Sequence, residues 1–177
     1  MVDVYVAAGS NVEPGQHLTL ALEALRRDFP DVRSSSWYTN AAVGFEGDDF
    51  INLVVGFTSD RPVEEVVLQL QAIETLCGRP RDAARWAPRS MDLDILLYDD
   101  LIRDDPRLKL PRPDLLKRAF MLGPLAELAP DVVHPTAGAT IGELWSRFDR
   151  AAHPMQKIEG TSTSRRSVPH PPPESGR

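Results

Sequence analysis

Apolar side chains recur along this chain with two different periods, one typical of strands and one typical of helices. Residues 3–9 form a short apolar run rich in β-favouring side chains, which predicts a first strand. A helix is expected to begin near Pro14, a residue suited to a first helical turn. Leu18, Leu22 and Leu25 then recur at helical spacing and give this helix one buried stripe.

The rest of the apolar pattern predicts four more strands and three more helices. The expected strands cover 33–38, 50–57, 91–98 and 107–110, and the expected helices cover 62–78, 115–129 and 140–148, with Pro124 dividing the second of these. The order strand, helix, strand, strand, helix, strand favours an open antiparallel or mixed sheet with helices packed on it. This is an α+β layout.

The chain has 177 residues, of which 42% are hydrophobic, and this is enough apolar material for one core. One domain is therefore expected over residues 1–155. Residues 156–177 are rich in serine, proline and arginine without periodicity, which predicts a disordered tail. The single cysteine, Cys77, lies on an apolar helix face and is expected to pack in the core.

The longest apolar runs are far shorter than the ~20 residues that a membrane helix needs. The N-terminal segment has no basic leader ahead of its apolar residues, so it is interpreted as a strand and not as a secretory signal. A monomeric cytoplasmic protein without membrane contact is expected.

The net charge of −6 and the pI of about 5.2 predict a field that repels nucleic acid and phosphorylated ligands alike. An anion site in such a chain needs a local excess of positive charge. Four arginines supply one within eleven residues, at Arg79, Arg81, Arg85 and Arg89. A run of charges is usually only a solvated surface, but Trp86 and two prolines interrupt this one and favour an irregular loop that closes over a ligand.

Two carboxylates follow this arginine segment on a single predicted strand. Asp92 and Asp94 are two residues apart, so their side chains share one face, with Cα atoms ~7 Å apart. Like charges so placed repel each other unless a cation lies between them, and Mg²⁺ suits a few oxygen ligands completed by substrate phosphates. An isolated Asp-x-Asp is common in hairpins and at solvent-facing edges, whereas Arg89 three residues earlier adds a partner for phosphate oxygens.

Two further polar residues interrupt apolar faces. Asn52 lies beside Phe50 on a strand face, where it either bonds a nearby turn or presents a hydrogen-bonding fork to a flat ligand stacked on Phe50. From the strand alone, the bond to a turn is the favoured interpretation. Glu74 lies on or beside the buried stripe of its helix, so its carboxylate needs a partner, and the arginines follow directly.

Several short motifs together resemble the 6-hydroxymethyl-7,8-dihydropterin pyrophosphokinase family, over roughly residues 2–150. They are Gly9-Ser10-Asn11, Phe50-Ile51-Asn52, Glu74 ahead of Gly78-Arg79, the run from Ala87 to Asp94, and Arg118-Ala119-Phe120. The resemblance implies transfer of the β,γ-pyrophosphate of ATP to the hydroxymethyl group of the dihydropterin, which gives AMP, in folate synthesis. It also implies a ferredoxin-like α+β fold with mobile loops around the site.

The resemblance further implies roles for individual residues. Asp92 and Asp94 would bind two Mg²⁺ ions, and both would form the catalytic set with Arg79 and Arg89. Contacts to ATP would come from Gln71, Glu74, Arg81, Arg107, Arg112 and Arg118. The pterin would lie among Val43, Gly44, Phe50, Asn52, Trp86 and Phe120.

Two segments depart from the family pattern. Pro111-Arg112 stands where the family commonly has Pro-His, and arginine does not titrate near neutrality as histidine does. The loop 40–44 reads Asn-Ala-Ala-Val-Gly in place of Thr-Pro-x-x-Gly, so the same chemistry on a related pterin alcohol stays open. The alternative of another class is a noncatalytic ferredoxin-like module that binds a nucleotide or RNA, although Asp92 and Asp94 would repel phosphate without metal.

Overall fold

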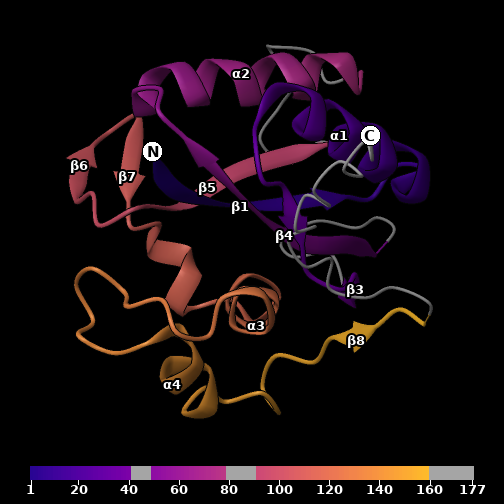
Figure 1. Ribbon diagram of the computed structural model, residues 1–177. Coiled ribbons are helices and arrows are strands. Elements are labelled where there is room, and N and C mark those ends of the chain that lie inside the picture. The colour runs from indigo at the N-terminus through magenta and orange to yellow at the C-terminus, as the bar shows by residue number, and fades with distance from the viewer. Residues whose placement is uncertain (41–48, 79–90, 160–177) are drawn as a thin grey trace, which may run out of the picture.

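The computed structural model describes residues 1–40, 49–78 and 91–159 and shows a main sheet between two helical layers, with a separate two-stranded sheet beside it (Figure 1). In chain order the elements are β1 (Val2–Ser10), α1 (Pro14–Asp28), β2 (Arg33–Ser34), β3 (Tyr38–Asn40), β4 (Phe50–Ser59), α2 (Val63–Leu76), β5 (Asp92–Tyr98), β6 (Arg103–Asp105), β7 (Leu108–Leu110), the 3-10 helix η1 (Pro113–Leu116), α3 (Ala119–Leu128), α4 (Ile141–Ser146) and β8 (Gln156–Lys157). Helices α1 and α2 cover one face of the sheet, and α3 and α4 lie on the other.

The strands of the main sheet follow the order β5-β1-β4-β3-β8, and β2 also pairs with β4. Every strand pairing in the described part of the chain is antiparallel. Strand β1 lies between β5 and β4 and pairs with β4 along its whole length, from Val2 opposite Ser59 to Ser10 opposite Ile51. The expected α+β fold, ferredoxin-like with a mostly antiparallel sheet and helices packed on it, is therefore confirmed.

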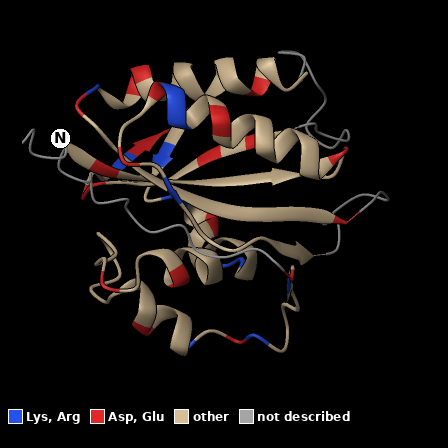
Figure 2. Ribbon diagram, turned by 45° about the vertical axis from the view of Figure 1, so that its right-hand side comes forward, with Lys and Arg blue, Asp and Glu red and all other residues tan. Residues whose placement is uncertain are grey.

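Both faces of the sheet are buried, which explains why its central strands are almost continuously apolar. One face packs against α1 and α2 through Val4, Val6, Leu53, Val55, Phe57 and Ile95. The other packs against η1, α3 and α4 through Tyr5, Ala7, Val54, Leu96 and Leu97. Figure 2 shows the long strands mostly tan, with charged residues concentrated on the helices and the shorter segments. Cys77 is 2% exposed and belongs to the first cluster, as expected.

The predicted strand 33–38 forms two short strands because it contains a bulge. Ser34 pairs with Val55 and Tyr38 pairs with Asn52, so four steps along one strand match three steps along β4. The hydroxyl of Ser35 accepts a hydrogen bond from Val54 N at 2.9 Å and thereby repairs the ladder at the bulge. The bulge matters for the site because it sets the register of β3 against Asn52.

The predicted division of the helix 115–129 at Pro124 is wrong. The chain instead forms η1, and α3 then runs without interruption from Ala119 to Leu128 with Pro124 inside it. The separation falls at Arg118, the N-cap residue of α3, whose φ of −120° and ψ of 119° are extended. Proline removes only one helical hydrogen bond, and the burial of neighbouring Leu122 and Leu125 outweighs that loss.

The C-terminal part of the sheet extends beyond the expected domain boundary at residue 155. Strand β8 pairs with β3, Lys157 lying opposite Tyr38 and Gln156 opposite Thr39. Residues 160–177 of the expected tail lie outside the described residues. Within the ranges that the structure describes, no helix combines the length and the apolar character that crossing a bilayer requires.

Candidate active site

Four residues from four strands form one row across the sheet, and this row organises the site. Gly9 on β1 pairs with Asp92 on one side and with Asn52 on the other, and Asn52 pairs with Tyr38 of β3. Directly opposed residues of antiparallel strands place their side chains on the same face. The Gly-Ser-Asn segment, the strand asparagine and the aspartate pair therefore meet on the face that carries α3.

Gly9 provides the space into which the amide of Asn52 extends. A Cβ atom at Gly9 would lie only 2.6 Å from Asn52 Oδ1 and 3.8 Å from Phe50 Cδ1. Real Cβ contacts do not reach 2.6 Å, so any other residue at this position must displace the amide. Phe50 precedes Asn52 by two residues and shares its face, where it is half-buried.

The side chain of Asn52 is held by a residue that the sequence did not indicate as functional. Asn52 is 7% exposed, and its Nδ2 group donates a hydrogen bond to Oδ1 of Asn40 at the end of β3. This bond agrees with the interpretation of Asn52 as a partner of a nearby segment. It also leaves Asn52 Oδ1 on the side of Gly9, where the amide oxygen is a hydrogen-bond acceptor.

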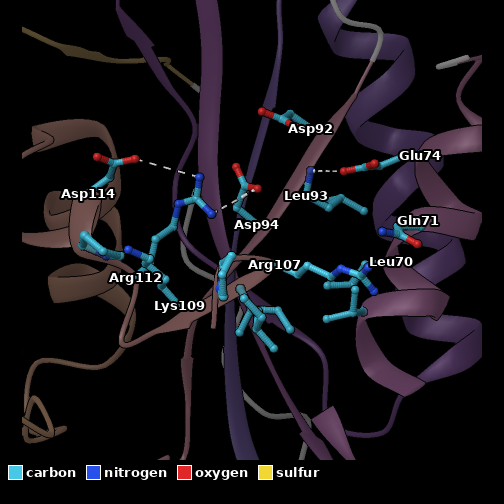
Figure 3. A pocket seen from close by; sticks show the side chains of 15 residues that line it. Leu70, Gln71, Glu74, Asp92, Leu93, Asp94, Arg107, Lys109, Arg112 and Asp114 are labelled. Atoms are coloured by element: carbon cyan, nitrogen blue, oxygen red, sulfur yellow. Dashed lines mark hydrogen bonds and ion pairs between the residues drawn. The ribbon is translucent and has the colours of Figure 1, made fainter. Parts of the chain in front are cut away.

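Asp92 and Asp94 lie on one face of β5, as predicted. They pair with Gly9 and Ala7 of β1, and both carboxylates are half-buried beside a pocket of about 640 Å³. Figure 3 shows the two carboxylates in this pocket, with Arg112 next to Asp94. The distance from Arg112 Nη1 to Asp94 Oδ1 is 3.4 Å.

Glu74 of α2 accepts a hydrogen bond from the backbone of the edge strand. Its Oε1 atom lies 2.9 Å from Leu93 N, between the two aspartates (Figure 3). Strand β5 ends the order of the main sheet, so its outer N–H groups have no neighbouring strand in the described part of the chain. The half-buried carboxylate thus ties α2 to the strand that carries Asp92 and Asp94.

The pocket brings together most of the residues expected at the nucleotide and metal, namely Gln71, Glu74, Asp92, Asp94, Arg107 and Arg112. Lys109 and Asp114 also line it, and sequence reasoning missed both, because neither stands in a recognisable motif. Arg118 does not line this pocket in the part of the chain that the structure describes. Phe120 is half-buried at the start of α3 and packs against the second cluster.

Several predicted site residues lie outside the described residues. They are Val43 and Gly44 of the loop 40–44, and Arg79, Arg81, Trp86 and Arg89 of the arginine segment.

The carboxylates on β5 fit a Mg²⁺ ion in chemical type. Among the described residues, no group of three or more histidine, cysteine or acidic side chains is arranged to hold a metal. Two half-buried carboxylates are a suitable protein contribution for Mg²⁺, which retains waters and takes further ligands from phosphate. Asp94 already has the positive charge of Arg112 beside it.

The family model described as 7,8-dihydro-6-hydroxymethylpterin-pyrophosphokinase (HPPK) matches residues 5–130. The chain belongs to the HPPK family. This membership confirms the resemblance found in the sequence motifs, and it favours a pyrophosphokinase over a noncatalytic module.

Similar proteins extend the match beyond the family model. The chain is 41% identical over 161 residues to 2-amino-4-hydroxy-6-hydroxymethyldihydropteridine pyrophosphokinase of Pseudomonas aeruginosa, which covers 88% of this chain and 94% of that protein. It is 36% identical over 139 residues to the protein of the same description from Aquifex aeolicus, with coverage of 76% and 85%.

Solved structures show the same fold at lower identity. A crystal structure of HPPK-DHPS in complex with substrates aligns with a TM-score of 0.64 at 12% identity and covers 85% of this chain. Wild-type HPPK-DHPS of Plasmodium falciparum with pteroate aligns with a TM-score of 0.65 at 13% identity and covers 82% of this chain. This HPPK-family chain spans 44% of the length of each of these two chains.

Replacing Gly9 by alanine (G9A) tests whether the position of the Asn52 amide depends on the absence of a side chain at residue 9. The added Cβ displaces the Asn52 amide, so we expect a changed Asn52 side-chain NH₂ signal in NMR spectra and a loss of about 1–3 kcal/mol in the free energy of unfolding. Gly15 of α1 has no atom within 4 Å of the equivalent Cβ position, and G15A serves as the matched control. Equal, small effects of G9A and G15A would contradict the prediction.

Proposed function

We propose that this HPPK-family chain transfers the β,γ-pyrophosphate of ATP to the hydroxymethyl group of 6-hydroxymethyl-7,8-dihydropterin, a step of folate biosynthesis. The observation that carries the proposal is the row in which Gly9 joins Asp92 to Asn52. Asp92 lies across Gly9 from Asn52, and Asp94 follows two residues along β5, so carboxylates suited to metal–phosphate chemistry share a sheet face with an amide suited to a heterocycle.

The reaction needs one bond to form and one to break at the β-phosphorus. The hydroxymethyl oxygen of the pterin bonds to the β-phosphorus, and the bond from that phosphorus to the α,β-bridging oxygen breaks. AMP leaves with the bridging oxygen, and the hydroxyl proton is released. Positioning and charge neutralisation by the protein are the main requirements of such a transfer.

Asp92 and Asp94 are proposed to hold Mg²⁺, with two ions per site. The chemistry that bound Mg²⁺ would supply is neutralisation of phosphate oxygens and alignment of the transferred group. The two carboxylates that would hold it share one face of β5, and the Glu74 contact to Leu93 N keeps that edge of the strand in place. The pairing of β5 with β1 along the two aspartates supports a rigid orientation of their carboxylates.

The cationic residues around the pocket are proposed to bind the ATP phosphates. Arg107 and Arg112 line the pocket, and Gln71 and Glu74 stand on its α2 side. By family resemblance, Arg81 and Arg118 also contact phosphate, and Arg79 and Arg89 stabilise the moving pyrophosphoryl group. Local positive charge of this kind is required because the whole chain carries a net charge of −6.

The pterin is proposed to lie on the sheet face above Gly9. Asn52 Oδ1 is oriented as an acceptor by Asn40, so it suits an N–H donor on the ligand edge. The 2-amino group in the name of the related pyrophosphokinases is such a donor. Phe50, Phe120 and Trp86 are proposed to contact the flat faces of the ring, and Val43 and Gly44 to shape its pocket.

A monomeric cytoplasmic enzyme that binds neither nucleic acid nor membrane is also proposed. The acidic net charge supports the absence of nucleic-acid binding. The exposed large hydrophobic residues of the described segments are spread over different elements and so support a monomer. They are Met1, Leu68 and Leu76 of α2, Ile102, Leu116 of η1, and Val133.

AMP formation tests the proposed function directly. The folded protein is expected to produce AMP from ATP and Mg²⁺ only when 6-hydroxymethyl-7,8-dihydropterin is present, as measured by chromatography of the nucleotides. The 6-methyl analogue lacks the accepting oxygen and serves as the control that yields no AMP. Failure to form AMP, with the fold verified by circular dichroism, would refute the proposal.

Neutralising either aspartate tests the metal assignment. Asp92→Asn and Asp94→Asn are each expected to abolish Mg²⁺-dependent binding of α,β-methylene-ATP, measured by calorimetry, because an amide is a weaker ligand than a carboxylate. Addition of EDTA to the unchanged protein should have the same effect. Asp131→Asn removes one negative charge at an exposed position outside the pocket and should leave binding unchanged. Unaltered binding in D92N and D94N would remove the metal assignment.

Variants of Asn40 test its role in orienting Asn52. Asn40→Ala removes the acceptor of the Asn52 N–H and is expected to raise KM for the dihydropterin about tenfold, with a smaller change in kcat. Asn40→Asp keeps an acceptor oxygen and should stay within about threefold of the unchanged protein. Thr39→Ala alters the neighbouring, opposite-facing position of β3 and is the control. Equal KM values for N40A and N40D would show that Asn40 does not orient the amide.

A further inference from the structure

Arg112 stands between two carboxylates at the edge of the pocket. Its Nη1 atom is 3.4 Å from Asp94 Oδ1, and its Nη2 atom is 3.9 Å from Asp114 Oδ2. Figure 3 shows the guanidinium group between the two acidic side chains, close to the carboxylate of Asp94. The guanidinium therefore places positive charge beside the carboxylate that is proposed to hold a metal ion.

The backbone of Arg112 is fixed, so only its side chain is able to move. Its N–H donates to Leu96 O at 2.9 Å, and its carbonyl accepts from Leu115 N at 3.1 Å. Leu96 is the extra residue of a bulge in β5, because Leu97 pairs with Tyr5 while Ile95 pairs with the next residue, Val6. The backbone of Arg112 is thus anchored to Leu96, which lies two residues after Asp94 on β5. Rotation about its side-chain bonds then moves the guanidinium within the pocket.

The contacts of the guanidinium leave hydrogen-bonding capacity unused. Arg112 Nε is buried and has no hydrogen-bond partner in the described part of the chain. The ion-pair distances of 3.4 Å and 3.9 Å are also longer than the distances of about 2.7–2.9 Å that charge-assisted hydrogen bonds reach. A ligand with several acceptor oxygens, such as a polyphosphate, satisfies the planar fork of N–H groups better.

We propose that Arg112 is an internal counter-ion of Asp94 that competes with the divalent metal and moves to a nucleotide phosphate when metal and nucleotide bind together. The inference rests on the proposed function, since it assigns the metal to Asp94. One cation replaces another at the carboxylate, and the displaced guanidinium gains an anionic partner. Metal and nucleotide then strengthen each other's binding, because each removes an obstacle to the other.

The charge of arginine makes this competition permanent at physiological pH. A guanidinium group stays protonated, whereas a histidine side chain loses its charge near neutrality. Before a nucleotide binds, the guanidinium of Arg112 therefore stands beside Asp94 as a competing cation, and binding of the metal alone is weakened.

Metal binding without nucleotide gives the first test. Mn²⁺ is titrated into the protein and the free ion is followed by electron paramagnetic resonance. Arg112→Gln (R112Q) removes the competing charge and is expected to bind Mn²⁺ about 2–5-fold more tightly, the range for a partly exposed ion pair. Lys117→Gln removes one positive charge from an exposed residue outside the pocket and should leave the affinity unchanged.

Nucleotide binding gives the second test, in which the affinity of R112Q is expected to fall and not to rise. R112Q is expected to bind α,β-methylene-ATP in the presence of Mg²⁺ about tenfold more weakly, because a phosphate contact is lost. Tighter metal binding together with weaker nucleotide binding supports the proposal. A residue that only contacts phosphate, or only stabilises the fold, does not make Mn²⁺ bind more tightly.

Two results distinguish a failure of the counter-ion role from a failure of the metal assignment. Unchanged or weaker Mn²⁺ binding in R112Q would overturn the counter-ion role while leaving the metal at Asp94. If the unchanged protein takes up no Mn²⁺ even with the nucleotide analogue, the metal assignment of the proposed function fails. If R112Q does not fold, Arg112→Met replaces it, because methionine also removes the charge beside Asp94 while keeping an apolar stem of similar length. Mn²⁺ affinity should then still rise, and an unchanged affinity would again overturn the proposal.

Discussion

The register of β1 between β4 and β5 is the constraint on which the site depends. Because β1 pairs with both neighbours, Gly9 stands opposite Asn52 on one side and opposite Asp92 on the other. A shift of one residue would turn these side chains to the face covered by α1 and α2. The two different clusters packed on the faces of β1 and β4 prevent such a shift, since it would exchange the side chains of the two cores and bury the polar row beneath α1 and α2. Packing of the core therefore also positions Asn52 and Asp92 on either side of Gly9.

Irregularities in the sheet place the remaining functional side chains. The bulge at Ser35 sets β3 so that Asn40 reaches Asn52, and the bulge at Leu96 presents the carbonyl that anchors Arg112. Bulges interrupt the ladder and redirect side chains, which a regular strand cannot do. In this HPPK-family chain the long regular pairings hold the carboxylates, and the irregular positions bring polar partners to them.

The pocket concentrates positive charge in a protein that is acidic as a whole. The net charge of −6 disfavours anions, yet Arg107, Lys109 and Arg112 line the pocket that holds Asp92 and Asp94. The guanidinium of Arg112 partly neutralises Asp94 before any ligand arrives. The same arrangement offers positive charge to phosphate and negative charge to metal once a ligand separates the pairs, which is why a mixed-charge pocket suits a metal-bound polyphosphate.

The sequence by itself determined the α+β class, the main strands and helices, the shared face of Asp92 and Asp94, and the family. These depend on local periodicity and on short motifs, which are present along the chain before folding. It did not determine the bulges, the continuous helix through Pro124, the Glu74 bond to Leu93 N, or the roles of Asn40 and Asp114 beside their partners. Only the tertiary structure decided these, because each depends on strand register or on packing between segments far apart in the chain.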